Sequence, residues 1–184
     1  MLPTRYLRGL AATPFDGAPG VFAVPHARRP GSYRYLCSYR DGQREKPRIF
    51  TLLARYGQPE PPAEWDLHHV VEGQHFADVD FRGALLTLYT DVLPCVLIHQ
   101  AEHRAYNRLL HARETDVLFR DALPRDVAER SRATAAAWRD PKRRGELRTR
   151  VGALAALYRD AYDGDPVLQH VAQNVLDEAL AQLP

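Results

Sequence analysis

Cysteine, lysine and long hydrophobic runs are scarce in this chain. Its 184 residues include two cysteines, Cys37 and Cys95, both in apolar surroundings. Two cysteines cannot build a disulfide framework, so we expect buried free thiols. The only lysines are Lys46 and Lys142, and every other basic residue is an arginine. Arginine suits phosphate because it binds two oxygens at once, but a GC-rich genome produces the same bias, and we give that explanation more weight.

Signals for membrane insertion or export are not evident either. No run approaches the ~18 apolar residues of a membrane-spanning helix, and residues 1–15 lack the apolar stretch of a secretory signal. We therefore expect no membrane segment and cytoplasmic synthesis in a bacterium or a phage-infected cell, with any export using a machine that needs no signal. The net charge of +2 does not by itself indicate nucleic acid, and the hydrophobic fraction of 45% can fill one core.

The first part of the chain predicts little regular structure, followed by a hairpin. Residues 1–32 are rich in Pro and Gly, and we expect an irregular arm with a short strand at 21–24. Aromatic and apolar residues then alternate with polar ones on both sides of Asp41-Gly42. Alternation around an Asp-Gly pair is typical of two antiparallel strands, so residues 32–57 predict a β-hairpin.

The rest of the chain predicts two short strands and then helices. Apolar runs predict strands at 65–71 and 93–98, and a helix follows at 99–112. Helical spacing returns in the tail, where Asp165-Pro166 is typical of a helix start. The expected regions are an N-terminal arm and hairpin (1–64), a central unit (65–112) and a helical C-terminal region (113–184).

Four of the eight histidines stand in two pairs within the central unit. His68 and His69 end the first strand, and His99 and His103 stand one helical turn apart at the head of the helix. Three imidazoles converging on one ion suit Zn²⁺, with Ni²⁺, Co²⁺ or Mn²⁺ as alternatives. Three protein ligands leave open positions for substrate, which is the mark of a catalytic rather than a structural site.

This layout resembles the HNH (ββα-metal) nucleases, in particular the colicin-type branch with its His-His doublet, loop and His-x-x-x-His pair. The resemblance covers residues 65–112. It implies an α+β fold in which a ββα-metal finger is flanked by the N-terminal β-hairpin and the C-terminal helical layer. It implies one divalent metal ion held by His68, His99 and His103. The implied activity is metal-dependent endonucleolytic hydrolysis of DNA phosphodiester bonds.

The resemblance also implies roles for further residues. His69 matches the general base that takes a proton from the attacking water. Asp91 stands nearest to the place of the family's Asn. The longer loop that contains it also holds His75, which is a possible extra ligand but which we expect to face solvent. Arg104 is placed to contact a phosphate beside the cut. Asp66 shares a strand face with His68 and could accept the outer N–H of a metal-bound imidazole.

Sequences with a His-His doublet are common among secreted antibacterial toxins of this family. We therefore expect an effector nuclease whose partners are DNA and a cognate immunity protein. The alternatives are a phage or mobile-element HNH endonuclease, and a non-enzymatic interaction module stabilised by zinc. Residues 124–184 are expected to form a helical layer that supports or targets the nuclease and supplies no ligand. Their only histidine is His170.

Overall fold

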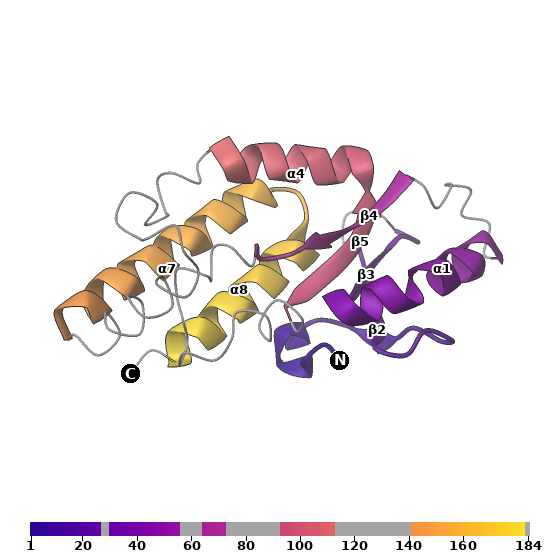
Figure 1. The fold of residues 1–184 in the computed structure, drawn as a ribbon, viewed down its shortest axis with the longest axis horizontal. Helices are drawn as coiled ribbons and strands as arrows, with labels where there is room; N and C mark the ends of the chain where they lie inside the picture. The colour runs from indigo at the N-terminus through magenta and orange to yellow at the C-terminus, as the bar shows by residue number, and fades with distance from the viewer. Residues whose placement is uncertain (27–29, 56–63, 73–92, 113–140, 183–184) are drawn as a thin grey trace.

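The computed structural model contains one antiparallel sheet and four α-helices in the part of the chain that it describes (Figure 1). The described residues are 1–26, 30–55, 64–72, 93–112 and 141–182. Asp91 and His75 lie outside them, as does the expected insertion between the two central strands. The elements are a 3-10 helix η1 (Thr4–Leu7), strands β1 (Thr13–Pro14), β2 (Val21–Pro25), β3 (Tyr33–Ser38), β4 (Trp65–His69) and β5 (Pro94–His99), and helices α1 (Tyr39–Arg55), α4 (Gln100–Ala112), α7 (Pro141–Ala161) and α8 (Pro166–Gln182).

The sheet has the strand order β1-β2-β3-β5-β4, and every neighbouring pair is antiparallel. The predicted strands of the central unit are confirmed as β4 and β5, which pair with each other. The predicted helix is confirmed as α4, which begins at Gln100, one residue after His99. Because β3 also pairs with β5, the strands of the N-terminal region and of the central unit share one sheet.

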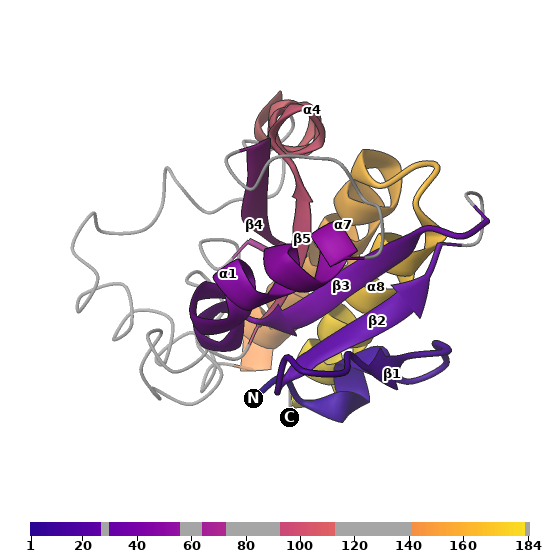
Figure 2. The same cartoon turned by 90° about the vertical axis from the view of Figure 1, so that its right-hand side faces the viewer.

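Helices cover both faces of the sheet (Figure 2), and each face has its own cluster of buried apolar side chains. Helix α1 packs on one face, where its Ile49, Phe50 and Leu53 meet Cys37 and Leu97. We call this the α1 face. Helices α4, α7 and α8 pack on the opposite face, which we call the helix face. Its buried apolar sheet residues include Val24, Leu36, Val96 and Ile98.

The predicted second strand of the N-terminal hairpin is wrong, because residues 39–55 form helix α1. The signal that identifies this helix is Ser38-x-x-Asp41: the Ser38 hydroxyl accepts the backbone N–H of Asp41 at 3.2 Å and donates to its carboxylate at 2.7 Å. This is a helix-starting arrangement. Gly42 is not a turn residue but the point where α1 approaches the sheet, since a Cβ there would lie 2.6 Å from Leu67 Cδ2 and 2.7 Å from Cys37 Sγ.

The predicted helical layer is confirmed for residues 141–182, where α7 and α8 bury Val151, Leu154, Val171 and Val175. The predicted start of the last helix is also confirmed, because Asp165 Oδ1 accepts the backbone N–H of Leu168 at 3.1 Å. None of the described helices has the length and apolar composition needed to cross a membrane.

Candidate functional site

The two histidines of the doublet lie on opposite faces of the sheet. Strand β4 stays regular through its end, with His68 opposite Val96 and His69 opposite Cys95. Adjacent residues of a strand point to opposite faces. His68 therefore faces the helix face and His69 faces the α1 face. The structure does not bring the expected ligand His68 and the expected base His69 to one site.

His68 is buried, and its hydrogen bonds fix where its proton lies. Its Nε2 is 2.8 Å from the Tyr162 hydroxyl, and that hydroxyl donates to the Val70 carbonyl at 2.8 Å. A hydroxyl has one proton, so Tyr162 must accept from the Nε2–H of His68. The Nδ1 of the neutral ring then carries a lone pair. This buried Nδ1 has no hydrogen-bond partner among the residues that the structure describes.

Burial keeps both the imidazole of His68 and the hydroxyl of Tyr162 uncharged. Burial, helped by the neighbouring imidazoles of His103 and His69, lowers the pKa of His68 to about 3. Burial also raises the pKa of Tyr162 well above its usual range. Leaving a buried polar atom without a partner costs about 1–3 kcal/mol, and such atoms are rare in native proteins. The described residues include two other buried atoms that form no hydrogen bond, Nε2 of His69 and Oδ1 of Asn107, so burial alone does not identify a ligand site. The Nδ1 of His68 is the candidate because its ring also lies beside a second imidazole, that of His103.

His103 and Asp66 lie next to His68 on the helix face. The ring centroids of His68 and His103 are 5.0 Å apart, and His103 Nδ1 is 3.3 Å from Asp66 Oδ2. The side chains of His103 and Asp66 are 25% and 39% exposed. The three groups thus run from the protein interior to solvent, and each is a common ligand of divalent transition metals.

His99 does not join this group, because both of its ring nitrogens bond elsewhere. Its Nδ1 accepts the backbone N–H of Ala101 at 3.1 Å, which makes His99 the residue that caps α4. Its Nε2 lies 3.1 Å from Glu64 Oε2. His99 is opposite Trp65 in the strand pair and belongs to the α1 face.

On the α1 face, His69 stacks on Tyr39 at the start of α1, with ring centroids 5.1 Å apart and planes 15° apart. Arg104 is exposed on α4, where its Nε donates to the Gln100 carbonyl at 3.3 Å. No three side chains of His, Cys, Asp or Glu in the described ranges are gathered closely enough, as they stand, to hold a metal ion.

A buried ion cluster that the sequence did not reveal braces the helix face. Arg34 donates to Asp165 Oδ2 at 2.8 Å and to Glu102 Oε2 at 2.9 Å, so it ties β3 to α4 and to the start of α8. Burial alone would lower the pKa of Arg34, but the hydrogen bond to Glu102 and the two carboxylate charges outweigh burial and raise it. Tyr106 donates to Glu102 Oε1 at 3.1 Å, and its ring packs on that of His68 at 5.8 Å. The cluster therefore abuts the histidine site.

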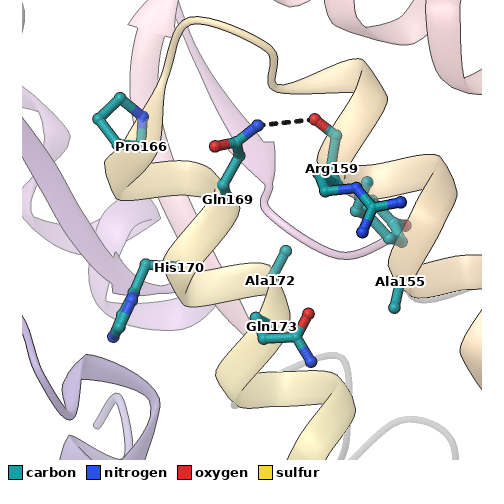
Figure 3. A pocket seen from close by; sticks show the side chains of 8 residues that line it. Ala155, Arg159, Pro166, Gln169, His170, Ala172 and Gln173 are labelled. Carbon is teal, nitrogen blue, oxygen red and sulfur yellow. Dashed lines mark hydrogen bonds between the residues drawn. The ribbon is translucent and has the colours of Figure 1, made fainter.

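A cavity of about 250 Å³ between α7 and α8 contains none of these groups (Figure 3). Two of the polar side chains that line it already bond to backbone carbonyls. Gln169 Nε2 donates to the Arg159 carbonyl at 2.8 Å, and His170 Nε2 lies 2.6 Å from the Arg8 carbonyl. His170 thus points toward the N-terminal segment, away from His68 and His103.

Comparisons of the chain with protein-family models, with curated proteins and with solved structures found no match. The geometry of the site and the resemblance in residues 65–112 are therefore the basis for assigning a function.

Proposed function

We propose that this chain is a metal-dependent endonuclease that hydrolyses DNA phosphodiester bonds, and that its metal site lies on the helix face at His68 and His103. The observation that carries the proposal is the Nδ1 of His68, a buried lone pair with no partner among the described residues, beside a second imidazole. The order β4, β5, α4 supports it, because the resemblance implies this ββα order.

The donor chemistry fits a divalent transition metal such as Zn²⁺, with Ni²⁺, Co²⁺ or Mn²⁺ as alternatives. His68 and His103 would be two of the ligands. For the third we favour Asp66 over His99, because Asp66 shares the face of His68 and lies near His103, whereas His99 is engaged by Glu64 and Ala101. The partly exposed side chains of His103 and Asp66 would have to turn toward Nδ1 of His68 to complete the set.

A bound ion there would act as a Lewis acid and stabilise the charge that develops on phosphorus and on the leaving oxygen. The chain itself supplies positioning. Arg104 follows His103 on α4 and Arg108 lies one turn further, and both are exposed. Their guanidinium groups would bind phosphates that flank the cut.

The general base implied by the resemblance is His69, and its role depends on the end of β4. With β4 as described, the sheet lies between His69 and the His68–His103 pair. His69 could reach water at that pair only if the strand ended one residue earlier. Asp91, which the resemblance places in the loop around the base, lies outside the described residues.

The test is cleavage of supercoiled plasmid with Zn²⁺, Ni²⁺, Co²⁺ or Mn²⁺ added to chelator-treated protein, together with metal analysis. We expect His103→Ala to lose the metal and to cleave roughly a thousandfold more slowly or worse, since a metal ion contributes several kcal/mol to such a transition state. His170→Ala is the matched histidine control and should keep both metal and activity. Equal metal content in His103→Ala and the unaltered chain would rule the site out.

We also propose an effector role with an immunity partner, as the resemblance implies. Expression should then be toxic and be relieved by a neighbouring gene, whereas a phage or mobile-element enzyme would need no such partner. A chain that binds zinc tightly but leaves DNA intact under all four metals would favour the third alternative, an interaction module.

A further inference from the structure

The side chain that completes the histidine site is that of Tyr162, the residue that directly follows helix α7, far from the motif in sequence. Tyr162 is fully buried, and among the described residues its hydroxyl forms two hydrogen bonds, with the Val70 carbonyl and with the Nε2 of His68, each at 2.8 Å. Because the carbonyl can only accept, the direction of both hydrogen bonds is determined. His68 must donate through Nε2.

This direction decides which atom of His68 is available to a ligand. A neutral imidazole has one N–H, so a proton on Nε2 leaves the lone pair on Nδ1. That atom is the one without a partner among the described residues. Metal-bound histidines usually donate their other ring N–H to a fixed acceptor, which sets both the tautomer and the ring orientation. Tyr162 stands where that acceptor is needed.

We infer that Tyr162 is a positioning residue that holds the proton of His68 on Nε2 and so presents Nδ1 as the metal-binding atom. The ligation step rests on the proposed function, whereas the tautomer belongs to the metal-free chain.

Tyr158 provides a closely matched control. It lies one turn earlier on α7, it is also buried, and its ring stacks against that of Tyr162 at 5.9 Å. Its hydroxyl accepts the backbone N–H of Glu72 at 2.7 Å, just beyond the doublet. The variant Tyr158→Phe therefore loses a similar hydrogen bond close to the end of β4, but the hydroxyl of Tyr162 stays in place as the partner of His68.

The experiment combines nitrogen NMR of the metal-free chain at pH 7.5, labelled with ¹⁵N at histidine, with Zn²⁺ titration against a chromophoric chelator. The signal of His68 is assigned with His68→Gln. We expect His68 to show the Nε2–H tautomer in the unaltered chain. Tyr162→Phe should bind Zn²⁺ roughly 10- to 100-fold more weakly, the usual effect of losing such an outer partner. Tyr158→Phe should bind Zn²⁺ as tightly as the unaltered chain.

An Nδ1–H tautomer of His68 in the unaltered chain would overturn the inference, and this measurement stands even if Tyr162→Phe fails to fold. Equal zinc affinity in folded Tyr162→Phe and the unaltered chain would overturn it as well, as would an equal loss in Tyr158→Phe. Absence of zinc binding by the unaltered chain would instead overturn the proposed metal site, and the ligation step with it. The failures of the two proposals are thus distinguishable.

Discussion

The two faces of the sheet at the histidine doublet differ in how their polar groups are satisfied. On the helix face, His68 keeps an unpartnered Nδ1 near His103, and a buried ion cluster around Arg34 lies beside it. On the α1 face, His99 caps a helix and His69 stacks on an aromatic ring. The histidines of the motif therefore have different contacts, and these indicate different roles. On the α1 face His99 is explained by its cap on α4, whereas on the helix face the Nδ1 of His68, beside the imidazole of His103, is the atom for which we propose a ligand.

Among the variants that test the difference between the two faces, we expect the largest loss of stability on the helix face, from substitution of Arg34. In Arg34→Met the carboxylates of Asp165 and Glu102 lose their buried partner, so we expect the free energy of unfolding to fall by about 3 kcal/mol, the lower end for breaking a buried pair, because Glu102 is 22% exposed. Urea denaturation measures this. Arg5→Met is the control, since its pair with Glu178 is exposed and should contribute less than about 1 kcal/mol. Equal losses in the two variants would contradict the proposed importance of the cluster.

The next effect is a pH dependence that His68 gives to the metal-free chain. Its folded pKa is about 3, below the unfolded value of ~6.5, so the unfolded state binds more protons between these values. The contribution of neutral His68 is fully present above pH 6.5 and is lost as the pH falls toward 3. Between pH 7.5 and pH 5 the free energy of unfolding should fall by ~2 kcal/mol.

The control for this pH dependence is His68→Gln, which keeps an N–H donor toward Tyr162 but cannot titrate. Urea denaturation at both pH values should show a flatter profile in this variant. An unchanged profile would mean that other groups cause the dependence and that His68 is not held neutral by its surroundings.

A smaller change in stability is expected on the α1 face, where substitution of Gly42 tests how closely α1 packs on the sheet. In Gly42→Ala the new Cβ would meet Leu67 and Cys37 below 3 Å, and such overpacking usually costs about 1–3 kcal/mol. Gly152→Ala on α7 is the opposite control, because nothing lies within 4 Å of its Cβ position and alanine favours the helix by up to ~1 kcal/mol. Thermal unfolding should move down in the first variant and up in the second. A stabilised Gly42→Ala would show that α1 does not lie so close to the sheet.

The smallest expected effect is that of His69→Ala on catalysis. Because the sheet separates His69 from the His68–His103 pair, we expect unchanged metal content and a cleavage rate within about tenfold of the unaltered chain. Loss of a general base would instead lower the rate roughly a hundred- to ten-thousandfold. A fall of that size, measured on the same plasmid substrate, would show that β4 opens in the active state and that the role implied by the resemblance is correct.

Local sequence signals were sufficient for β4, β5, α4 and the start of α8, because apolar runs and caps act over a few residues. They failed at α1, where Asp41-Gly42 is typical of a turn but Ser38 starts a helix, and where the glycine is required by contact with Leu67. The pairing of His103 with His68 was expected from the motif. The contact of Tyr162 with His68 could not be predicted from the sequence, because the two residues are 94 positions apart and meet only in the tertiary fold.

The hydrogen bonds around Val70 also fix the register of β4 against its neighbours. The Val70 N–H donates to the Pro94 carbonyl, and the Val70 carbonyl accepts from the Tyr162 hydroxyl. The backbone N–H of Glu72, two residues further on, donates to the Tyr158 hydroxyl. A slip of one residue would turn every side chain of the strand over. Because residues 68 and 69 are both histidines, such a slip would bury His69 in place of His68 against helices α4, α7 and α8, and a histidine would still occupy that position. Tyr158, near the end of α7, and Tyr162, directly after it, therefore select which of two identical neighbours is buried against the helices.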